Sequence, residues 1–292
     1  MENESKFINY LKTNAYDNLD ISSHTLDLQG WVNGGFDECL QLVISFLKDK
    51  ENIVFFEVGS WKGASVSKIC ENFNQIDLKY IICIDTWLGA PEFLTWGLDD
   101  NTRGISLNIE NGYPKVFYTF TKNIKTLNLH NTIIPFPISS IQAADVLEYY
   151  KIYADAMYID GAHEYKAVIA DLETYKTILK PGGILWGDDY NWPGVYQAVN
   201  EFSTKYNYKV TVIDVNWLIY TDQFKDVETI HENVETIHEN VETIHENVEI
   251  NWKVYISNYP DLQATGIDTE EKAITHFNNH GKSEGRTDKP LK

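Results

Sequence analysis

Three aspartates have the residue type and the placement to share a metal site. Asp160 ends one apolar run of the sequence, and Asp188 and Asp189 end the next. If these runs are neighbouring strands, the three carboxylates converge, and carboxylates this close must be protonated or neutralised by a cation. Hard oxygen ligands favour Mg2+, with water or substrate oxygens completing an octahedron. The alternative is that the acids only cap the helices that follow.

His163 stands three residues after Asp160, at the mouth of the same predicted strand. An imidazole titrates close to neutral pH and adjacent carboxylates favour its protonated form, so His163 is suited to act as a general base. A histidine in a loop is more often structural. The case for catalysis therefore depends on its position beside the aspartates.

Two further motifs indicate a ligand with a ribose and a cationic group. Gly59 and Gly63 flank Ser60 in a turn where glycine lets the backbone approach a ligand and a helix N-terminus presents unpaired N–H groups. Their spacing is not the GxGxxG of dinucleotide-binding folds, which disfavours a nicotinamide cofactor. Glu57 would face a cation such as the amine of a methionine moiety, and Asp85 would hold a ribose diol. Each motif alone is also compatible with an ordinary strand end.

The elements that must position these residues alternate between strands and helices, which predicts a doubly wound, mainly parallel sheet. The predicted strands are Ile53–Val58, Tyr80–Ile84, Thr132–Phe136, Ala156–Ile159, Gly183–Trp186, Lys209–Asp214 and Trp217–Tyr220, of which the last two form an antiparallel hairpin. The predicted helices are Phe36–Leu47, Ala64–Phe73, Ser140–Tyr150, Tyr165–Leu179 and Val195–Tyr206. We expect a Rossmann-like α/β fold with seven strands and the motifs at the carboxyl ends of its strands, where open sheets bind ligands.

Composition restricts the class of partner. The 292 residues are 43% apolar and carry a net charge of −19, which is typical of a globular protein whose surface repels phosphate backbones. We therefore expect no nucleic-acid partner. Three unpaired cysteines (Cys39, Cys70 and Cys83), a polar N-terminus and the lack of an apolar run near roughly 18 residues predict a cytosolic protein without membrane contact. Few arginines and many asparagines and isoleucines indicate an AT-rich genome, such as that of a large DNA virus in a host cytoplasm.

The sequence pattern changes after residue 225, and we predict three segments. Residues 1–225 form the α/β domain. Residues 226–250 hold three copies of Val-Glu-Thr-Ile-His-Glu-Asn with Val and Ile at heptad positions a and d. They predict either a coiled coil that makes a homo-oligomer through 226–249 or a single spacer helix, because their i,i+4 glutamates repel one another. Residues 251–292 form a small helical tail that resembles a short module appended to diverse proteins, including glycan-processing enzymes.

Taken together, the motifs resemble the class I S-adenosylmethionine-dependent methyltransferases, and within them the macrocin O-methyltransferase type and a related group associated with glycan modification. The resemblance covers roughly residues 30–215 and is carried by the segments 57–63 (EVGSWKG), 84–89 (IDTWLG), 159–165 (IDGAHEY), 180–183 (KPGG) and 187–190 (GDDY). Many glycan-associated relatives have His-Asp where this chain has Asp188-Asp189. The double acid favours the metal-dependent branch of the group.

The resemblance implies a role for each matching position. It places Glu57 and Gly59 at the methionine end of the cofactor, Asp85 at the ribose and Ser139 or Ser140 near the adenine. The full set of implied cofactor-binding residues is Glu57, Gly59, Ser60, Gly63, Asp85, Ser139, Ser140 and Asp160. The implied Mg2+ ligands are Asp160, Asp188 and Asp189, and the implied base is His163.

The function expected from these residues is metal-dependent methylation of a hydroxyl, with S-adenosylmethionine and Mg2+ or another divalent cation as cofactors. The expected acceptor is a vicinal diol of a sugar or nucleotide-sugar, with His163 taking the proton. Aromatic side chains that could stack on a sugar are Trp31, Trp87, Trp96, Tyr190 and Trp192, although bulky aromatics are more often core residues. Two alternatives remain, a non-catalytic scaffold with this fold and a metal-independent enzyme that methylates nitrogen or a phenol.

Overall fold

The computed structural model describes residues 2–32, 34–91, 107–221 and 251–259, together with residues 262, 269, 272, 273, 277, 286 and 289. Contacts divide the chain into two compact units, Met1–Thr229 and Ile230–Lys292. The predicted heptad segment, Trp96 and most of the predicted tail module lie outside the described residues. In the second unit, helix α11 (Trp252–Asn258) contributes Tyr255 and Ile256 to a small apolar cluster with Leu262, Ala273 and Phe277.

A seven-stranded sheet forms the centre of the first unit, in the order β5-β2-β1-β6-β7-β9-β8. Strands β5, β2, β1, β6 and β7 pair in parallel, while β9 pairs antiparallel with both β7 and β8. This arrangement confirms the predicted Rossmann-like sheet and its closing hairpin. The strands are β1 (Ile53–Val58), β2 (Leu78–Asp85), β5 (Ile133–Pro137), β6 (Ala154–Ile159), β7 (Leu179–Gly187), β8 (Val210–Ile213) and β9 (Asn216–Tyr220).

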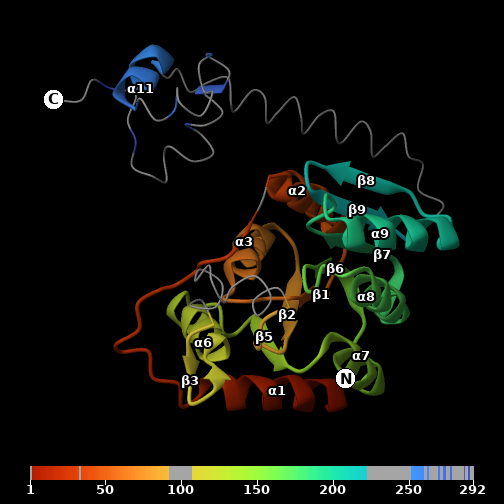
Figure 1. The fold of residues 1–292 in the computed structure, drawn as a ribbon. Coiled ribbons are helices and arrows are strands. Elements are labelled where there is room, and N and C mark those ends of the chain that lie inside the picture. Colours follow the sequence, from red (N-terminus) through yellow and green to blue (C-terminus); the bar gives the residue numbers. More distant parts are fainter. Residues whose placement is uncertain are drawn as a thin grey trace. The chain divides into compact units, whose positions relative to one another are not determined.

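Helices cover both faces of this sheet (Figure 1). On one face, residues of α1, α7, α8 and α9 join the main apolar core, and on the other, Phe36 of α2 packs against Tyr158 and Trp186 of the sheet. Because both faces are covered, the central strands are apolar almost throughout, and every residue of β1 and β6 is buried. The helices are α1 (Glu2–Tyr16), α2 (Phe36–Leu47), α3 (Ala64–Asn72), η1 (Phe73–Gln75), α6 (Val116–Thr126), α7 (Ser140–Tyr149), α8 (Tyr165–Thr177) and α9 (Pro193–Tyr206).

The structure differs from the predicted elements in three places. Helix α8 ends at Thr177, because Leu179 already begins β7. Residues 180–182, which lie before the predicted strand, therefore belong to β7. Its register against β6 shifts between Ala154 and Ala156. Helices α1 and α6 were not predicted. Their sequences mix polar and apolar residues and lack clear signals for where a helix begins or ends. A short hairpin of β3 (Ile109–Glu110) and β4 (Tyr113–Pro114) also precedes α6.

The topology fixes where a ligand can bind. The chain builds β1, β2 and β5 outward to one side and then returns to the other side of β1 to form β6 and β7. At such a reversal the loops after neighbouring strands part, and a crevice opens at the carboxyl ends of the strands. Across the described residues no helix is long and apolar enough to cross a membrane.

Trp186 tests how far the sheet depends on the packing beneath the site. Its indole is fully buried between Phe36 and Tyr158 and bonds Asn216 Oδ1. Trp186→Ala should lower the free energy of unfolding by about 3–5 kcal/mol, because it leaves a large cavity and an unpaired amide. Tyr10→Ala, at a position that is 64% exposed, should change it by less than about 0.5 kcal/mol. Urea unfolding measures both, and equal effects would contradict this packing.

Candidate functional site

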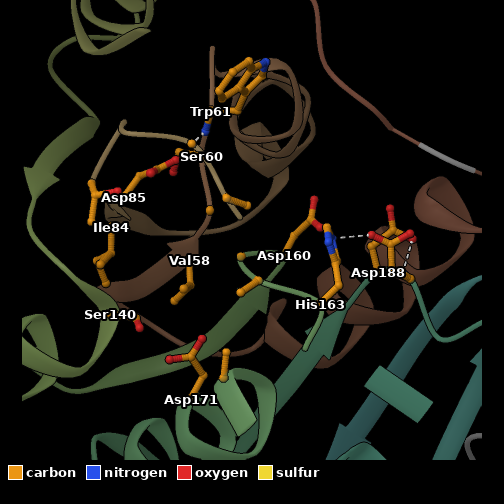
Figure 2. Close-up of a pocket in the computed structure, with 18 of the residues that line it drawn as sticks. Val58, Ser60, Trp61, Ile84, Asp85, Ser140, Asp160, His163, Asp171 and Asp188 are labelled. Carbon is orange, nitrogen blue, oxygen red and sulfur yellow. Dashed lines mark hydrogen bonds and ion pairs between the residues drawn. The ribbon is translucent and has the colours of Figure 1, made fainter. Parts of the chain in front are cut away.

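A cavity of about 500 Å3 opens at the carboxyl ends of β1, β2, β6 and β7. Figure 2 shows Asp85, Ser60 and Trp61 at one side of it, Asp160 at the centre and His163 with Asp188 at the other side. Of the cofactor residues that the sequence predicted, six line the cavity, namely Gly59, Ser60, Asp85, Ser139, Ser140 and Asp160. All four predicted metal and base residues, Asp160, His163, Asp188 and Asp189, line it too.

The turn after β1 is held in a conformation that few residues adopt. Gly59 has φ +89°, and a Cβ there would collide with the carbonyl oxygen of Asp160, so only glycine lets the ends of β1 and β6 meet. Trp61 has φ +46°, which is unfavourable for a bulky side chain. Such strain persists only when other contacts hold the backbone in place.

Asp85 provides those contacts. Its Oδ2 accepts a hydrogen bond from the backbone N–H of Trp61 at 2.9 Å, and its Oδ1 accepts one from that of Trp87 at 2.7 Å. The Trp87 indole in turn donates to the carbonyl of Trp61 at 2.6 Å. Burial raises the pKa of Asp85, while the hydrogen bonds from Trp87 and Trp61 act in the opposite direction. Asp85 therefore shapes the cavity wall that it also lines, and Trp87 serves as a core residue.

Two predicted cofactor residues lie outside the wall. The Glu57 carboxylate is fully buried and accepts hydrogen bonds from the Ser65 hydroxyl at 2.7 Å and the Cys83 thiol at 3.6 Å. Burial raises the pKa of Glu57 to about 7, although these hydrogen bonds oppose the shift. Gly63 caps α3 and faces Phe120 and Ile124. Glu57 reaches the cavity only indirectly, through residues such as Ser65 that line it.

The acidic cluster at the opposite side of the cavity contains Asp160, His163 and Asp189. One ligand atom from each lies within 4.8 Å of the other two. His163 Nε2 lies 2.8 Å from Asp189 Oδ2, and the Trp192 ring packs against the imidazole with centroids 4.5 Å apart. The pKa of Asp160 is raised well above its ordinary value, first by burial and then by Asp188 and Asp189. Metal binding is one way to offset this repulsion.

Asp188 does not join that group, although the sequence placed it among the metal ligands. Its side chain is 3% exposed, and its Oδ1 accepts hydrogen bonds from Asp189 N at 2.8 Å and Asn216 Nδ2 at 3.3 Å. Its carbonyl accepts another from the Trp217 indole at 3.1 Å. The difference arises because Asp189 adopts φ +58°, which directs the two consecutive side chains differently.

Sequence reasoning missed two parts of the wall. Residues 30–32 come from the segment before α2, whose sequence shows no periodic pattern; of these, only Trp31 was named, as an aromatic side chain that could stack on a sugar. Asp171 lies on α8 and also lines the cavity. Helical spacing could have identified it. Ala167, Ala170 and Asp171 are spaced i, i+3 and i+4, so they share one face of the helix.

Comparison with known proteins gives one family match and one curated relative. Residues 56–190 match a family described as "Methyltransferase domain". The relative is uncharacterized protein R132 of Acanthamoeba polyphaga mimivirus, which is 27% identical over 157 residues. That alignment covers 52% of this chain and 60% of the viral protein, so the chain spans less than two thirds of its relative's length.

Solved structures with a similar chain path include two methyltransferases. One is the O-methyltransferase from Bacillus cereus in complex with SAH, with 14% identity, a TM-score of 0.44 and coverage of 75% of this chain and 91% of that one. The other is CalS11, a calicheamicin methyltransferase, with 16% identity, a TM-score of 0.46 and coverage of 77% and 92%. The family match spans β1 through the end of β7, which are the elements that build the cavity. Residues 56–190 are therefore similar to a methyltransferase domain.

Proposed function

We propose that the protein transfers the methyl group of S-adenosylmethionine to a hydroxyl of a sugar-type acceptor, assisted by a divalent cation. The observation that carries this proposal is a single cavity with two chemically distinct ends. At one end Asp85, Ser60 and Gly59 form a turn suited to a nucleoside, and at the other Asp160, His163 and Asp189 form an acidic cluster with an imidazole. The cofactor and the acceptor would meet between them.

The cofactor end fits S-adenosylmethionine by its polar groups. Ser60 lines the cavity, and its hydroxyl is also within hydrogen-bonding reach of the buried Glu57 carboxylate behind the wall. Asp85 holds the backbone N–H groups of Trp61 and Trp87 and also lines the cavity, where a ribose hydroxyl would meet its carboxylate. When bound, S-adenosylmethionine supplies a methyl group on a positively charged sulfur, which the acidic wall would attract.

The opposite end fits a divalent cation by its donors. Two carboxylates and an imidazole offer two hard oxygen atoms and one nitrogen, a set that suits Mn2+ at least as well as the Mg2+ expected from three aspartates. A bound cation would supply charge that stabilises an acceptor oxygen as it loses its proton. Asp160 and Asp189 would hold it, and His163 lies close enough either to join them or to take the proton.

The protein's own residues determine how the acceptor is prepared. Asp189 fixes the orientation of the His163 imidazole through the 2.8 Å contact, and Trp192 packs against the ring and limits its rotation. The same contact favours the protonated imidazole that forms when His163 takes the proton of the acceptor hydroxyl. The cavity walls would then align the acceptor oxygen with the methyl donor.

The described wall favours a neutral acceptor. Trp31, which is 46% exposed, and Trp192 both line the cavity and offer rings for a sugar to stack on. No Lys or Arg is found among the lining residues in the part of the chain that the structure describes, and Lys62 nearby forms an ion pair with Asp27 at 2.8 Å. A sugar hydroxyl therefore suits this wall better than the diphosphate of a nucleotide-sugar.

A metal-independent enzyme is the second candidate, and the His163–Asp189 contact favours it. A histidine held by a carboxylate is a complete acid–base pair without any metal. Such a pair would suffice for a phenol, whose proton is more acidic than that of a sugar hydroxyl. The metal test below separates the two candidates.

Asp85 should decide whether the cofactor binds. Asp85→Ala removes the acceptor for the Trp61 and Trp87 amides and for a ribose, so the Kd for S-adenosylhomocysteine should rise at least about tenfold. Isothermal titration calorimetry measures it, with Asp49→Ala, at an exposed position, as the matched control. Unchanged binding by the Asp85 variant would contradict the assigned cofactor end.

The acidic cluster should bind a divalent cation. Asp160→Asn and Asp189→Asn should each weaken Mn2+ binding by on the order of tenfold or more, because each removes one charged ligand. Asp188→Asn should have a smaller effect, since Asp188 already accepts two hydrogen bonds. Electron paramagnetic resonance of free Mn2+ measures the affinities in the presence of S-adenosylhomocysteine. Wild-type protein that leaves Mn2+ free would favour the metal-independent pair.

Glu57 should make stability depend on pH. The pKa of this carboxyl is about 7 in the folded state, against 4.5 without the fold, so between these values the folded state holds the extra proton. The free energy of unfolding must then fall as pH rises from 4.5 to 7. Glu57→Gln removes this loss and should stabilise the protein relative to wild type at pH 8 by up to on the order of 3 kcal/mol.

Urea unfolding at pH 5.5 and pH 8 measures the effect of Glu57. The matched control is Glu51→Gln, at an exposed position, for which the difference from wild type should be the same at both pH values. If the difference in the free energy of unfolding between Glu57→Gln and wild type does not grow with pH, the Glu57 carboxyl is not the cause of the pH dependence.

A further inference from the structure

Asp171 is a buried acid of the cavity wall that no step above uses. It lies on α8, and its side chain is only 5% exposed. Figure 2 shows its carboxyl group directed toward Ser140, on the side of the cavity away from His163. The acid is therefore remote from the acidic cluster and cannot be explained by it.

Beside Ser139 and Ser140, the cavity wall that contains Asp171 also has aliphatic residues. These come from β1, β2, α7 and α8, and they are Val58, Ile84, Ile141, Ala167 and Ala170. A Cβ built on Gly161 would lie 3.6 Å from Val58 Cγ1 and 3.9 Å from Asp171 Oδ2. The absent side chain of Gly161 thus leaves room beside the carboxylate, next to an aliphatic wall that suits the face of a planar ring.

The carboxylate has capacity for a ligand. The Ser140 hydroxyl donates one hydrogen bond to it, and a carboxylate offers about four lone-pair sites. Burial raises the pKa of Asp171 to about 6, so at neutral pH the group carries a charge that burial disfavours. A ligand N–H that donates to it would offset this cost.

We propose that Asp171 selects the base of the cofactor by accepting a hydrogen bond from the exocyclic amine of adenine. The inference rests on the proposed function, since it assumes that S-adenosylmethionine binds here, and it adds the residue that reads the base. A 6-oxo purine would place a carbonyl oxygen against the carboxylate, and the two acceptors would repel one another.

The test compares S-adenosylhomocysteine with its 6-oxo analogue S-inosylhomocysteine, in which a carbonyl replaces the exocyclic amine and N1 carries a proton. Calorimetric titration at about pH 8 keeps Asp171 ionised. Wild-type protein should bind the adenine ligand roughly ten- to hundredfold more tightly. In Asp171→Asn, whose amide can donate as well as accept, this preference should fall below roughly threefold.

Two further variants separate the hydrogen bond from other effects. Asp145→Asn, at an exposed position on α7, should keep the wild-type preference. Gly161→Ala adds a methyl group at ordinary contact distance from Asp171 Oδ2, so it should fold and should weaken binding of the adenine ligand by filling the room beside the carboxylate. The ratio of the two affinities is internal to each variant and is insensitive to a partial loss of folded protein.

The outcomes separate this inference from the function beneath it. If wild-type protein binds neither ligand, the proposed function fails. If it binds S-adenosylhomocysteine but shows no preference over the 6-oxo analogue, or if Asp171→Asn keeps the full preference, the role of Asp171 alone is overturned. The wild-type preference tests the proposal even where the Asp171 variant does not fold.

Discussion

Electrostatic repulsion among carboxylates at the ends of β6 and β7 is the constraint on which the account of this site depends. Asp160, Asp188 and Asp189 lie close together, and the pKa of Asp160 is raised first by its burial and then by repulsion from the other two carboxylates. The structure relieves part of this cost by pairing Asp189 with His163 and by surrounding Asp188 with the donors of Asn216 and Asp189. The charged form of Asp160 stays unfavourable, and either a bound cation or a proton must neutralise it.

At the cofactor end of the cavity, one carboxylate holds the backbone in a strained conformation. Asp85 holds Trp61 and Trp87, both of which have positive φ. This arrangement fixes the turn after β1 and the Asp85 carboxylate at the end of β2 before any ligand binds. Preorganisation of this kind reduces the entropy that binding must overcome. In the proposed function, one end of the cavity would bind the nucleoside and the other would bind the cation.

The sequence predicted the sheet well because its signals are local. Buried runs such as Ile53–Val58 and helices such as Phe36–Leu47 appear with the predicted bounds. The site was harder, because it depends on side-chain direction. Asp188 accepts hydrogen bonds from Asp189 and Asn216 and lies outside the group of ligand atoms, and the burial of Glu57 behind Ser65 follows from strand pleating against α3. Asp171 was missed because an acid on an amphipathic helix is ordinarily read as solvent-exposed.

The central claim is that one cavity brings together a nucleoside site and a cation site. Crystals grown with S-adenosylhomocysteine and Mn2+ would test it most directly, through anomalous scattering from the metal. The account predicts a single strong anomalous peak coordinated by Asp160 and Asp189, with the nucleoside bound beside Asp85 in the same cavity. A nucleoside bound elsewhere, or a fully bound nucleoside with no anomalous peak at these carboxylates, would contradict it.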